Sequence, residues 1–334
     1  KNIARVAKTD KIVIEKSTLP VRTAEKIKEI LDKQGSGVHF EILSNPEFLA
    51  EGTAIEDLFK SDRVLIGGDQ TETGQEAVQA LVDIYTNWIP KEKILTTNVW
   101  SSELSKLASN AMLAQRISSI NSLSALCEKT GANIEELSKA IGMDHRIGPK
   151  FLKASVGFGG SCFQKDILNL VYLCKYYGLE EVADYWHQVI KINDYQKNRF
   201  AQKIIDHFGG DLMGKKITVL GWAFKANTND SRESPAIYIA EKLFKAGAIL
   251  EIYDPMVSKE SIFRDIDFYW EASKKGDLNS RISVIDSVSK LDLSNDAVAI
   301  LTQWEAFKNL DFSKTVVFDG RGISSSSFYS IGKG

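Results

Sequence analysis

The chain has 334 residues, enough for two or three domains, because a single hydrophobic core seldom grows past roughly 250 to 300 residues. Its 42 Lys and Arg residues are balanced by 44 Asp and Glu residues, and the net charge of -2 excludes the broad basic surface of a nucleic-acid-binding protein. The sequence shows neither an apolar run long enough to span a membrane nor a signal peptide, which predicts a cytosolic protein.

Cysteines and histidines are few and scattered. The three cysteines lie at positions 127, 162 and 174, and the four histidines at 39, 145, 187 and 207. This odd, widely spaced set of cysteines does not form a disulfide framework, and no histidine shows a paired ligand spacing with a cysteine. We therefore expect neither disulfides nor a metal site.

The first hundred residues alternate β-rich runs with helical stretches. A helical pattern opens at Pro20, and strands are predicted at 11–17, 38–44, 63–68 and 93–97. This alternation predicts a mainly parallel sheet with helices packed on it. No G-x-G-x-x-G motif occurs, so the segment is interpreted as the later half of a dinucleotide-binding fold without its phosphate-binding first turn.

The middle of the chain is predicted to be helical. One run begins at Ser101 and stops at Gly131, and a second extends over 180–208. From 217 onward, strands and helices alternate again, and Asp254 closes the second strand of this part. The predicted domains are 1–98, 99–210 and 211–334.

The stretch "GFGGSCFQKD" places Cys162 directly after a glycine-rich turn and at the start of a helical pattern. The thiolate is the reactive form of cysteine, and the N-terminus of a helix favours an anion. Asp166 lies four residues further on, so the pair is typical of a covalent nucleophile beside an acid/base group. The alternative is a surface turn in which the thiol has no role. Cys127 and Cys174 fall within apolar helical stripes and are predicted to be buried core thiols.

Two other groups of polar residues indicate a catalytic or ligand-binding function. Glu103, Lys106 and Asn110 share one face of the first long helix, which is either a solvated face or a rigid surface that stabilises an oxyanion. In "SNPEFLAEGTA", Glu47 and Glu51 follow a strand and are predicted to lie at the carboxyl edge of a sheet, where open α/β folds bind their ligands.

Six separated stretches together resemble one family. They are "EKSTLPV", "SNPEFLAEGTA", "SSELSKLASNAMLAQRISSINSLSALCE", "GFGGSCFQKD", "GWAFKANTNDSRESPA" and "FDGR". In order and spacing they are similar to the UDP-glucose 6-dehydrogenases of the UDP-glucose/GDP-mannose dehydrogenase family. Their residues most resemble those of the animal enzymes. The resemblance implies an α/β protein with two Rossmann-like parallel-sheet domains, the first of them incomplete here, joined by a central helical region with a long connecting helix.

The resemblance also implies an activity. The family oxidises the C6 hydroxymethyl of UDP-glucose to a carboxylate with two hydride transfers to NAD. By this likeness Cys162 forms a thiohemiacetal and then a thioester, Lys106 and Asn110 stabilise the oxyanion, and Asp166 and Glu47 position or activate water, with Glu47 as the hydrolytic base.

Further site residues follow from the resemblance alone. Arg146 corresponds to the arginine that the family contributes across a dimer interface, within a homo-oligomer of dimers or hexamers. The implied cofactor contacts are Thr18, Glu51, Lys165 and Arg232. The implied substrate contacts are Phe48, Leu49, Arg146, Phe151, Lys153, Phe158, Gly159, Phe163, Phe224, Lys225 and Arg321.

The sequence departs from the family pattern at two places that matter. The glycine-rich phosphate cradle is missing, and Gly322 stands where animal members have a second arginine. Two alternatives therefore remain open at this stage. One is a catalytically incompetent module that binds a nucleotide sugar or assembles with itself, and the other is a dehydrogenase of another nucleotide sugar such as GDP-mannose.

Overall fold

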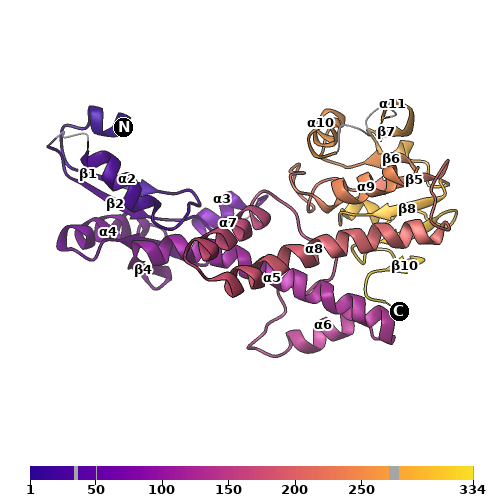
Figure 1. Cartoon of the computed structure of the whole chain (residues 1–334), viewed down its shortest axis with the longest axis horizontal. Helices are drawn as coiled ribbons and strands as arrows, with labels where there is room; N and C mark the ends of the chain where they lie inside the picture. The colour runs from indigo at the N-terminus through magenta and orange to yellow at the C-terminus, as the bar shows by residue number, and fades with distance from the viewer. Residues whose placement is uncertain (34–36, 50, 271–277, 334) are drawn as a thin grey trace. The chain divides into compact units, whose positions relative to one another are not determined.

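A computed structural model describes residues 1–33, 37–49, 51–270 and 278–333 (Figure 1). The chain divides into two compact units, Lys1–Asn110 and Ala111–Gly334. The division falls inside one long helix, α5 (Val99–Thr130).

A four-stranded sheet organises the first unit. The strands run in the order β1-β2-β3-β4. β1 pairs with β2 and β3 pairs with β4 in parallel, whereas β2 and β3 meet in one antiparallel pair, Ser44 with Gly67. The expected mainly parallel sheet is thus present, with its two halves running in opposite directions. The bounds are β1 Lys11–Glu15, β2 Phe40–Ser44, β3 Val64–Gly68 and β4 Ile94–Asn98.

Helices cover this sheet through two apolar clusters. Val78 and Leu81 of α4 pack on Leu43 and Ile66 of the strands, and Leu31 of α2 packs on Phe40. The helical pattern that opens at Pro20 was placed too early, because the backbone of Arg22 is left-handed (φ 76°) and the helix begins after it. The bounds are α1 Asn2–Val6, α2 Thr23–Asp32, α3 Ala54–Phe59, α4 Glu72–Tyr85 and η1 Lys91–Lys93.

The second unit begins with helices. α8 (Glu180–His207) packs against α7 (Phe163–Tyr176) along its first half and against α9 (Pro235–Lys245) further on (Figure 1). The first long helix stops before Gly131, whose φ of +79° is the left-handed conformation that ends helices, as the sequence predicted. The bounds are α6 Ile134–Gly142, α7 Phe163–Tyr176 and α8 Glu180–His207.

A six-stranded parallel sheet forms the rest of the second unit, in the order β10-β9-β8-β5-β6-β7. The order reverses at β5, which lies between β6 and β8. Ligands of open α/β sheets bind beyond the carboxyl ends of the strands at such a point. The strands are β5 Lys216–Leu220, β6 Ile249–Tyr253, β7 Ile282–Ile285, β8 Ala297–Ile300, β9 Val316–Asp319 and β10 Tyr329–Ser330, and the helices are α9 Pro235–Lys245, α10 Lys259–Tyr269, α11 Leu278–Arg281, η3 Val288–Lys290 and η4 Glu305–Phe307.

None of the helices in the described part of the chain combines the length and the apolar character needed to cross a membrane. Within residues 1–33, 37–49, 51–270 and 278–333, His, Cys, Asp and Glu side chains do not gather in a group of three or more that could hold a metal ion.

Candidate functional site

The polar stripe of α5 is not a solvated face. Glu103, Lys106 and Asn110 are 4%, 5% and 8% exposed, although all three side chains are polar. The Lys106 ammonium lies 3.6 Å from Oε1 of Glu47. A buried lysine requires a compensating anion, and this carboxylate supplies one. The structure therefore favours the second of the two readings of this stripe, a rigid charged surface.

Glu47 and Phe48 are held next to Lys106 by the segment that follows β2. The Glu47 carboxylate accepts the backbone N–H of Leu49 (2.7 Å), which fixes the turn. The Phe48 ring lies 5.2 Å from the Lys106 ammonium and 3.9 Å from the Arg63 guanidinium. These four side chains form a charged and aromatic cluster near the carboxyl end of β2, where the sequence predicted Glu47 to lie.

Two carboxylates lie close together at the end of β1. Glu103 accepts the N–H groups of Arg22 (2.6 Å) and Ala24 (2.8 Å) at the start of α2, and burial raises its pKa above the ordinary value. Glu15 is 6% exposed, and burial together with the Glu103 charge raises its pKa to about 7. Both oxygens of Glu15 lack a hydrogen-bond partner in the described structure. Thr18 follows in the loop after β1.

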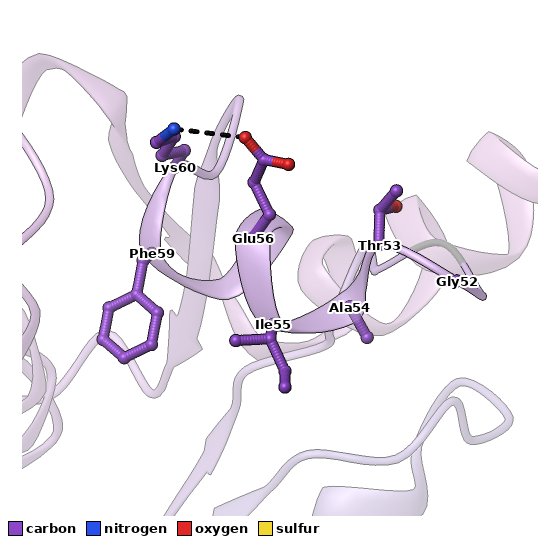
Figure 2. Close-up of a pocket in the computed structure, with 7 residues that line it drawn as sticks. All are labelled: Gly52, Thr53, Ala54, Ile55, Glu56, Phe59 and Lys60. Carbon is purple, nitrogen blue, oxygen red and sulfur yellow. Dashed lines mark hydrogen bonds and ion pairs between the residues drawn. The ribbon is translucent and has the colours of Figure 1, made fainter.

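An open depression follows Glu51 in the sequence (Figure 2). Its volume is about 730 Å³, and Ile55 and Phe59 on it are 78% and 58% exposed. All of its lining residues come from one segment, and the predicted catalytic side chains are not among them. The lining residues are Gly52, Thr53, Ala54, Ile55, Glu56, Phe59 and Lys60.

In the second unit, Cys162 is the N-cap residue of α7 and its side chain is exposed. Its sulfur lies 3.6 Å from the Ser161 hydroxyl. Its carbonyl accepts the N–H of Asp166 (2.9 Å), whose carboxylate is 1% exposed and lies 3.6 Å from the Lys165 ammonium. The prediction that Cys162 sits at the helix start is confirmed. Cys127 and Cys174 are buried, as predicted.

The glycines before Cys162 allow two other segments to approach closely. A Cβ on Gly159 would lie 2.5 Å from the carbonyl oxygen of Glu233, and Gly160 (φ +85°) would bring its Cβ to 3.1 Å from the Phe224 ring. The N–H of Gly160 also donates to the carbonyl of Arg232 (2.8 Å). The structure thus brings Phe224, predicted to contact substrate, to the glycine-rich turn.

Aromatic packing connects the two ends of this turn. The rings of Phe158 and Phe163 meet edge to face, with centroids 5.7 Å apart. Phe158 is buried in the apolar cluster formed by α7, α8 and the second part of α5. The two predicted substrate contacts therefore lie side by side, on either side of Cys162 in the sequence.

Arg321 lies beyond β9 at the carboxyl edge of the six-stranded sheet. Its guanidinium donates to the carbonyls of Leu301 (2.6 Å) and Phe224 (3.3 Å). Burial lowers the pKa of Arg321 to about 10, although Asp319 opposes this shift. Partial desolvation and the nearby Arg321 likewise lower the pKa of Lys153. The two cations at this edge can bind an anionic group such as a phosphate.

Several other predicted residues pair with neighbours in the sequence. The Arg146 side chain is 78% exposed and pairs with Asp144 at 2.6 Å, and Phe151 is 42% exposed. Arg232 pairs with Asp230 at 2.8 Å, and the Lys225 ammonium lies 5.6 Å from the ring of its neighbour Phe224. A role for Arg146 across a dimer interface concerns a second copy of the chain.

Sequence reasoning missed several residues that build the site. Asn193 bonds the backbone of Phe158, Arg63 contacts Phe48, and Asp319 accepts four backbone N–H groups from the turn that contains Arg321. A signal existed for Asn193, since "KINDYQKN" interrupts an apolar helical stripe with amides, as the stripe in α5 does.

Comparison with known proteins identifies the family. Three family models match the chain: the NAD binding domain of the UDP-glucose/GDP-mannose dehydrogenase family at residues 1–89, its central domain at 100–195 and its UDP binding domain at 218–326. UDP-glucose 6-dehydrogenase 4 of Oryza sativa subsp. japonica is 53% identical over 99% of this chain and 74% of its own length. This chain belongs to the UDP-glucose/GDP-mannose dehydrogenase family.

Further relatives refine this assignment. UDP-glucose 6-dehydrogenase 3 of Arabidopsis thaliana is 54% identical, with 99% of this chain and 74% of the relative covered. A solved UDP-glucose dehydrogenase from the archaeon Pyrobaculum islandicum superposes with a TM-score of 0.84 at 32% identity, covering 98% of this chain and 71% of that chain. The expected α/β fold with two sheets and a long central helix is confirmed. Both of these curated relatives are plant enzymes, and a specific likeness to animal enzymes is not supported.

The first unit, which matches the NAD binding domain of the family, carries a hydroxyl and a carboxylate after its first two strands. The Thr18 hydroxyl follows β1 at its carboxyl end, and Glu51 follows the Glu47 turn. A hydroxyl and a carboxylate suit the hydroxyl groups of a ribose. When bound, NAD supplies the hydride acceptor.

Proposed function

We propose that this chain is an NAD-dependent UDP-glucose 6-dehydrogenase that converts UDP-glucose to UDP-glucuronate. Close relatives at 53–54% identity carry that name. The observation that carries the mechanistic part of the proposal is Cys162, an exposed thiol at the N-cap of a helix, directly after a glycine-rich turn. Two-step oxidation of an alcohol to an acid in one site requires a nucleophile that holds the intermediate aldehyde.

The covalent steps follow from the chemistry of the thiol. After the first hydride leaves C6 and the hydroxyl proton is lost, the Cys162 thiolate adds to the aldehyde carbon and gives a thiohemiacetal. Loss of a second hydride and of the hydroxyl proton leaves a thioester. Water then attacks the thioester carbon, the C–S bond breaks, and the carboxylate departs. Two NAD⁺ and one water are consumed for each sugar, and three protons are released.

Lys106 and Asn110 stabilise the negative oxygen on C6 in these steps. Lys106 is rigidly placed because it is buried on α5 and lies 3.6 Å from Glu47. A positioned cation in a water-poor site stabilises a developing oxyanion without reorganising. Glu47, as the partner of Lys106, acts as the base for the hydrolytic water, and buried Asp166 helps to position that water.

The substrate contacts in this proposal are those that the family resemblance implies. The Phe48 ring lies beside Lys106, and the backbone N–H of Leu49 bonds Glu47. Arg321 and Lys153 hold the diphosphate, and the remaining contacts surround the sugar and the uracil: Phe151, Phe158, Gly159, Phe163, Phe224 and Lys225. Thr18, Glu51, Lys165 and Arg232 contact NAD. The three-part division into 1–98, 99–210 and 211–334 assigns these roles to an NAD part, a central helical part that contains the dimer helices, and a UDP-sugar part.

Turnover tests the proposed activity. Purified chain is mixed with UDP-glucose and NAD⁺, and NADH absorbance is followed together with the amount of UDP-glucuronate. We expect two NADH for each UDP-glucuronate. Normal binding of UDP-glucose in calorimetry without any NADH would show a binding or assembly module instead. Turnover of GDP-mannose, but not of UDP-glucose, would assign the other nucleotide sugar.

Replacing the nucleophile tests the covalent step. Cys162→Ser retains a hydroxyl that is a far weaker nucleophile, so steady turnover is expected to fall by at least about 1,000-fold while UDP-glucose binding stays near the parent value. Mass spectrometry of the quenched variant should reveal an aldehyde-stage or covalently held intermediate. Cys174→Ser, which changes a buried core thiol, is the matched control. Parent-like turnover by Cys162→Ser would disprove the thioester route.

A further inference from the structure

We infer that Asn193 on α8 is a positioning residue for the catalytic turn and sets the placement of Cys162. The inference rests on the proposed function for its kinetic part. Asn193 is 1% exposed and lies in the middle of a long helix, where a buried amide is costly unless each of its polar atoms is bonded. Its partners are the backbone atoms of a single residue in the turn.

The Asn193 amide holds Phe158 at two points. Its Oδ1 accepts the Phe158 N–H at 2.8 Å, and its Nδ2 donates to the Phe158 carbonyl at 3.0 Å. A side chain amide carries one acceptor and one donor group side by side, so it replaces the neighbouring strand that this irregular segment lacks. Both backbone groups of Phe158 are thereby satisfied by one side chain.

Gly157 makes this approach possible. A Cβ on Gly157 would lie 2.6 Å from Oδ1 of Asn193, closer than any side chain tolerates, and its φ of +123° is a conformation that favours glycine. The same Cβ would also lie 3.5 Å from Cγ of Lys197, one helical turn after Asn193. The glycine and the asparagine therefore form a matched pair.

A chain of contacts leads from Phe158 to the thiol. The Phe158 ring packs edge to face on Phe163, the residue directly after Cys162 and the first residue of α7. On the other side of the turn, Gly160 is fixed by its bond to the Arg232 carbonyl. Cys162 thus lies between two residues that are held in place, Gly160 and Phe163. The Asn193 bonds fix Phe158, which comes two residues before Gly160.

Two neighbouring amides also bond the backbone of this segment, but at Ser155. Gln196 donates to the carbonyl of Ser155 (2.7 Å), and Asn121 of α5 accepts the Ser155 N–H (2.9 Å). These bonds fix the start of the segment, further from the thiol. Of Asn121, Asn193 and Gln196, only Asn193 bonds Phe158, which is closer to Cys162 in the sequence than Ser155 is.

The experiment compares Asn193→Ala and Asn193→Asp with Asn198→Ala, which removes an exposed amide from the same helix. Three kinds of measurement are made. Steady-state kinetics give kcat and the KM values for UDP-glucose and NAD⁺, thermal unfolding gives the melting temperature, and mass spectrometry gives the rate at which iodoacetamide alkylates Cys162. Asn193→Ala should lower kcat by about 10- to 100-fold with little change in the KM for NAD⁺, since small misplacements of reacting groups cost rates of this size. The alkylation rate should change at least about threefold, because the accessibility of a thiol follows its placement.

The aspartate variant separates positioning from folding. In Asn193→Asp the new side chain is nearly isosteric and still accepts the Phe158 N–H, but its carboxylate faces the Phe158 carbonyl and cannot donate. Protonation restores the donor, so the kcat of Asn193→Asp, relative to that of the parent, should rise as pH falls from about 8 to about 6, because burial raises the pKa of a carboxyl group. A loss of melting temperature alone would produce no such profile.

Contrary results are equally clear. Parent-like kcat and alkylation in Asn193→Ala, or losses equal to those in Asn198→Ala, would overturn the inference. So would a pH-independent kcat ratio for Asn193→Asp. If the parent protein makes no NADH, the proposed function fails, while the alkylation rates still decide whether Asn193 controls the thiol.

Discussion

At the scale of single residues, Glu15 shows that this fold accepts an unfavourable group next to its ligand-binding edge. A carboxylate that is 6% exposed and has no hydrogen-bond partner for either oxygen in the described structure is costly when charged. The neighbouring Glu103 accepts two backbone N–H groups at the start of α2. An ionised carboxylate carries no proton, so Glu103 cannot donate a hydrogen bond to Glu15 in that state. The pair therefore makes stability depend on pH.

The direction of this dependence follows from linkage. The pKa of Glu15 is raised from 4.5 to about 7 in the folded chain, so the unfolded chain binds fewer protons between these two values. Stability is then unaffected by Glu15 below about pH 4.5, falls as pH rises towards 7, and stays low above it. At about 1.4 kcal/mol per pKa unit, the loss is at most about 3.5 kcal/mol.

Glu15→Gln tests this dependence. The neutral amide does not ionise, so the variant should be more stable than the parent at about pH 8 and should lose most of that advantage at about pH 5. Urea unfolding across this pH range measures the difference. Glu76→Gln, an exposed carboxylate on α4, serves as the control. Parallel stability curves for parent and Glu15→Gln would contradict the assignment.

At the scale of elements, Glu128 joins three segments of the second unit. From α5 it pairs with Arg199 of α8 at 2.7 Å, accepts the Tyr329 hydroxyl at 2.8 Å, and accepts the N–H of Gly332 at 2.9 Å. Burial opposes its charge, but the bonds from Gly332 and Arg199 outweigh burial and hold the pKa of Glu128 below its ordinary value. Its stabilising effect is present above the ordinary value of 4.5 and is lost as pH falls through the folded pKa.

Truncating Glu128 should expose the cost of a broken buried pair. Glu128→Ala leaves the Arg199 guanidinium, 11% exposed, without its anion, and the free energy of unfolding should fall by about 3 kcal/mol or more. Adding Arg199→Met should recover part of that loss. Chemical unfolding measures both variants. In Glu56→Ala, which removes an exposed ion pair with Lys60, no measurable change is expected. A double variant less stable than Glu128→Ala would refute this account.

At the scale of the whole molecule, large apolar side chains are exposed along α7 and the start of α8. Tyr172 and Tyr176 are 65% and 69% exposed with stacked rings, and Tyr185 is 53% exposed. An apolar face of this kind is typical of an interface between subunits. It supports the homo-oligomer that the sequence predicted.

Light scattering behind size exclusion tests this association. We expect a mass of about twice the 37.2 kDa of the chain, or a larger even multiple, and a fall in mass on dilution. Tyr172→Asp combined with Tyr176→Asp should shift the equilibrium towards single chains, whereas Phe268→Asp on α10, also exposed, should not. A parent protein that stays at the mass of one chain would contradict the prediction.

The sequence by itself determined most of the elements and the family. Strands with alternating or continuous apolar residues, the glycine that ends α5, and the thiol at the start of α7 are local features, and local propensity suffices for them. The same local rules placed the start of α2 too early, because Glu103, which caps that helix, lies about 80 residues away in the chain.

Only the tertiary structure decided which polar residues are buried and what they bond. The stripe of Glu103, Lys106 and Asn110 has the same spacing whether it faces water or the Glu47 turn, and Asn193 resembles any amide in an amphipathic helix until Phe158 is placed beside it. Burial and pairing depend on segments that are distant in sequence, and periodicity along one helix carries no information about them. The family of this chain was therefore readable from its motifs, whereas the bonds between Asn193 and the segment before Cys162 were not.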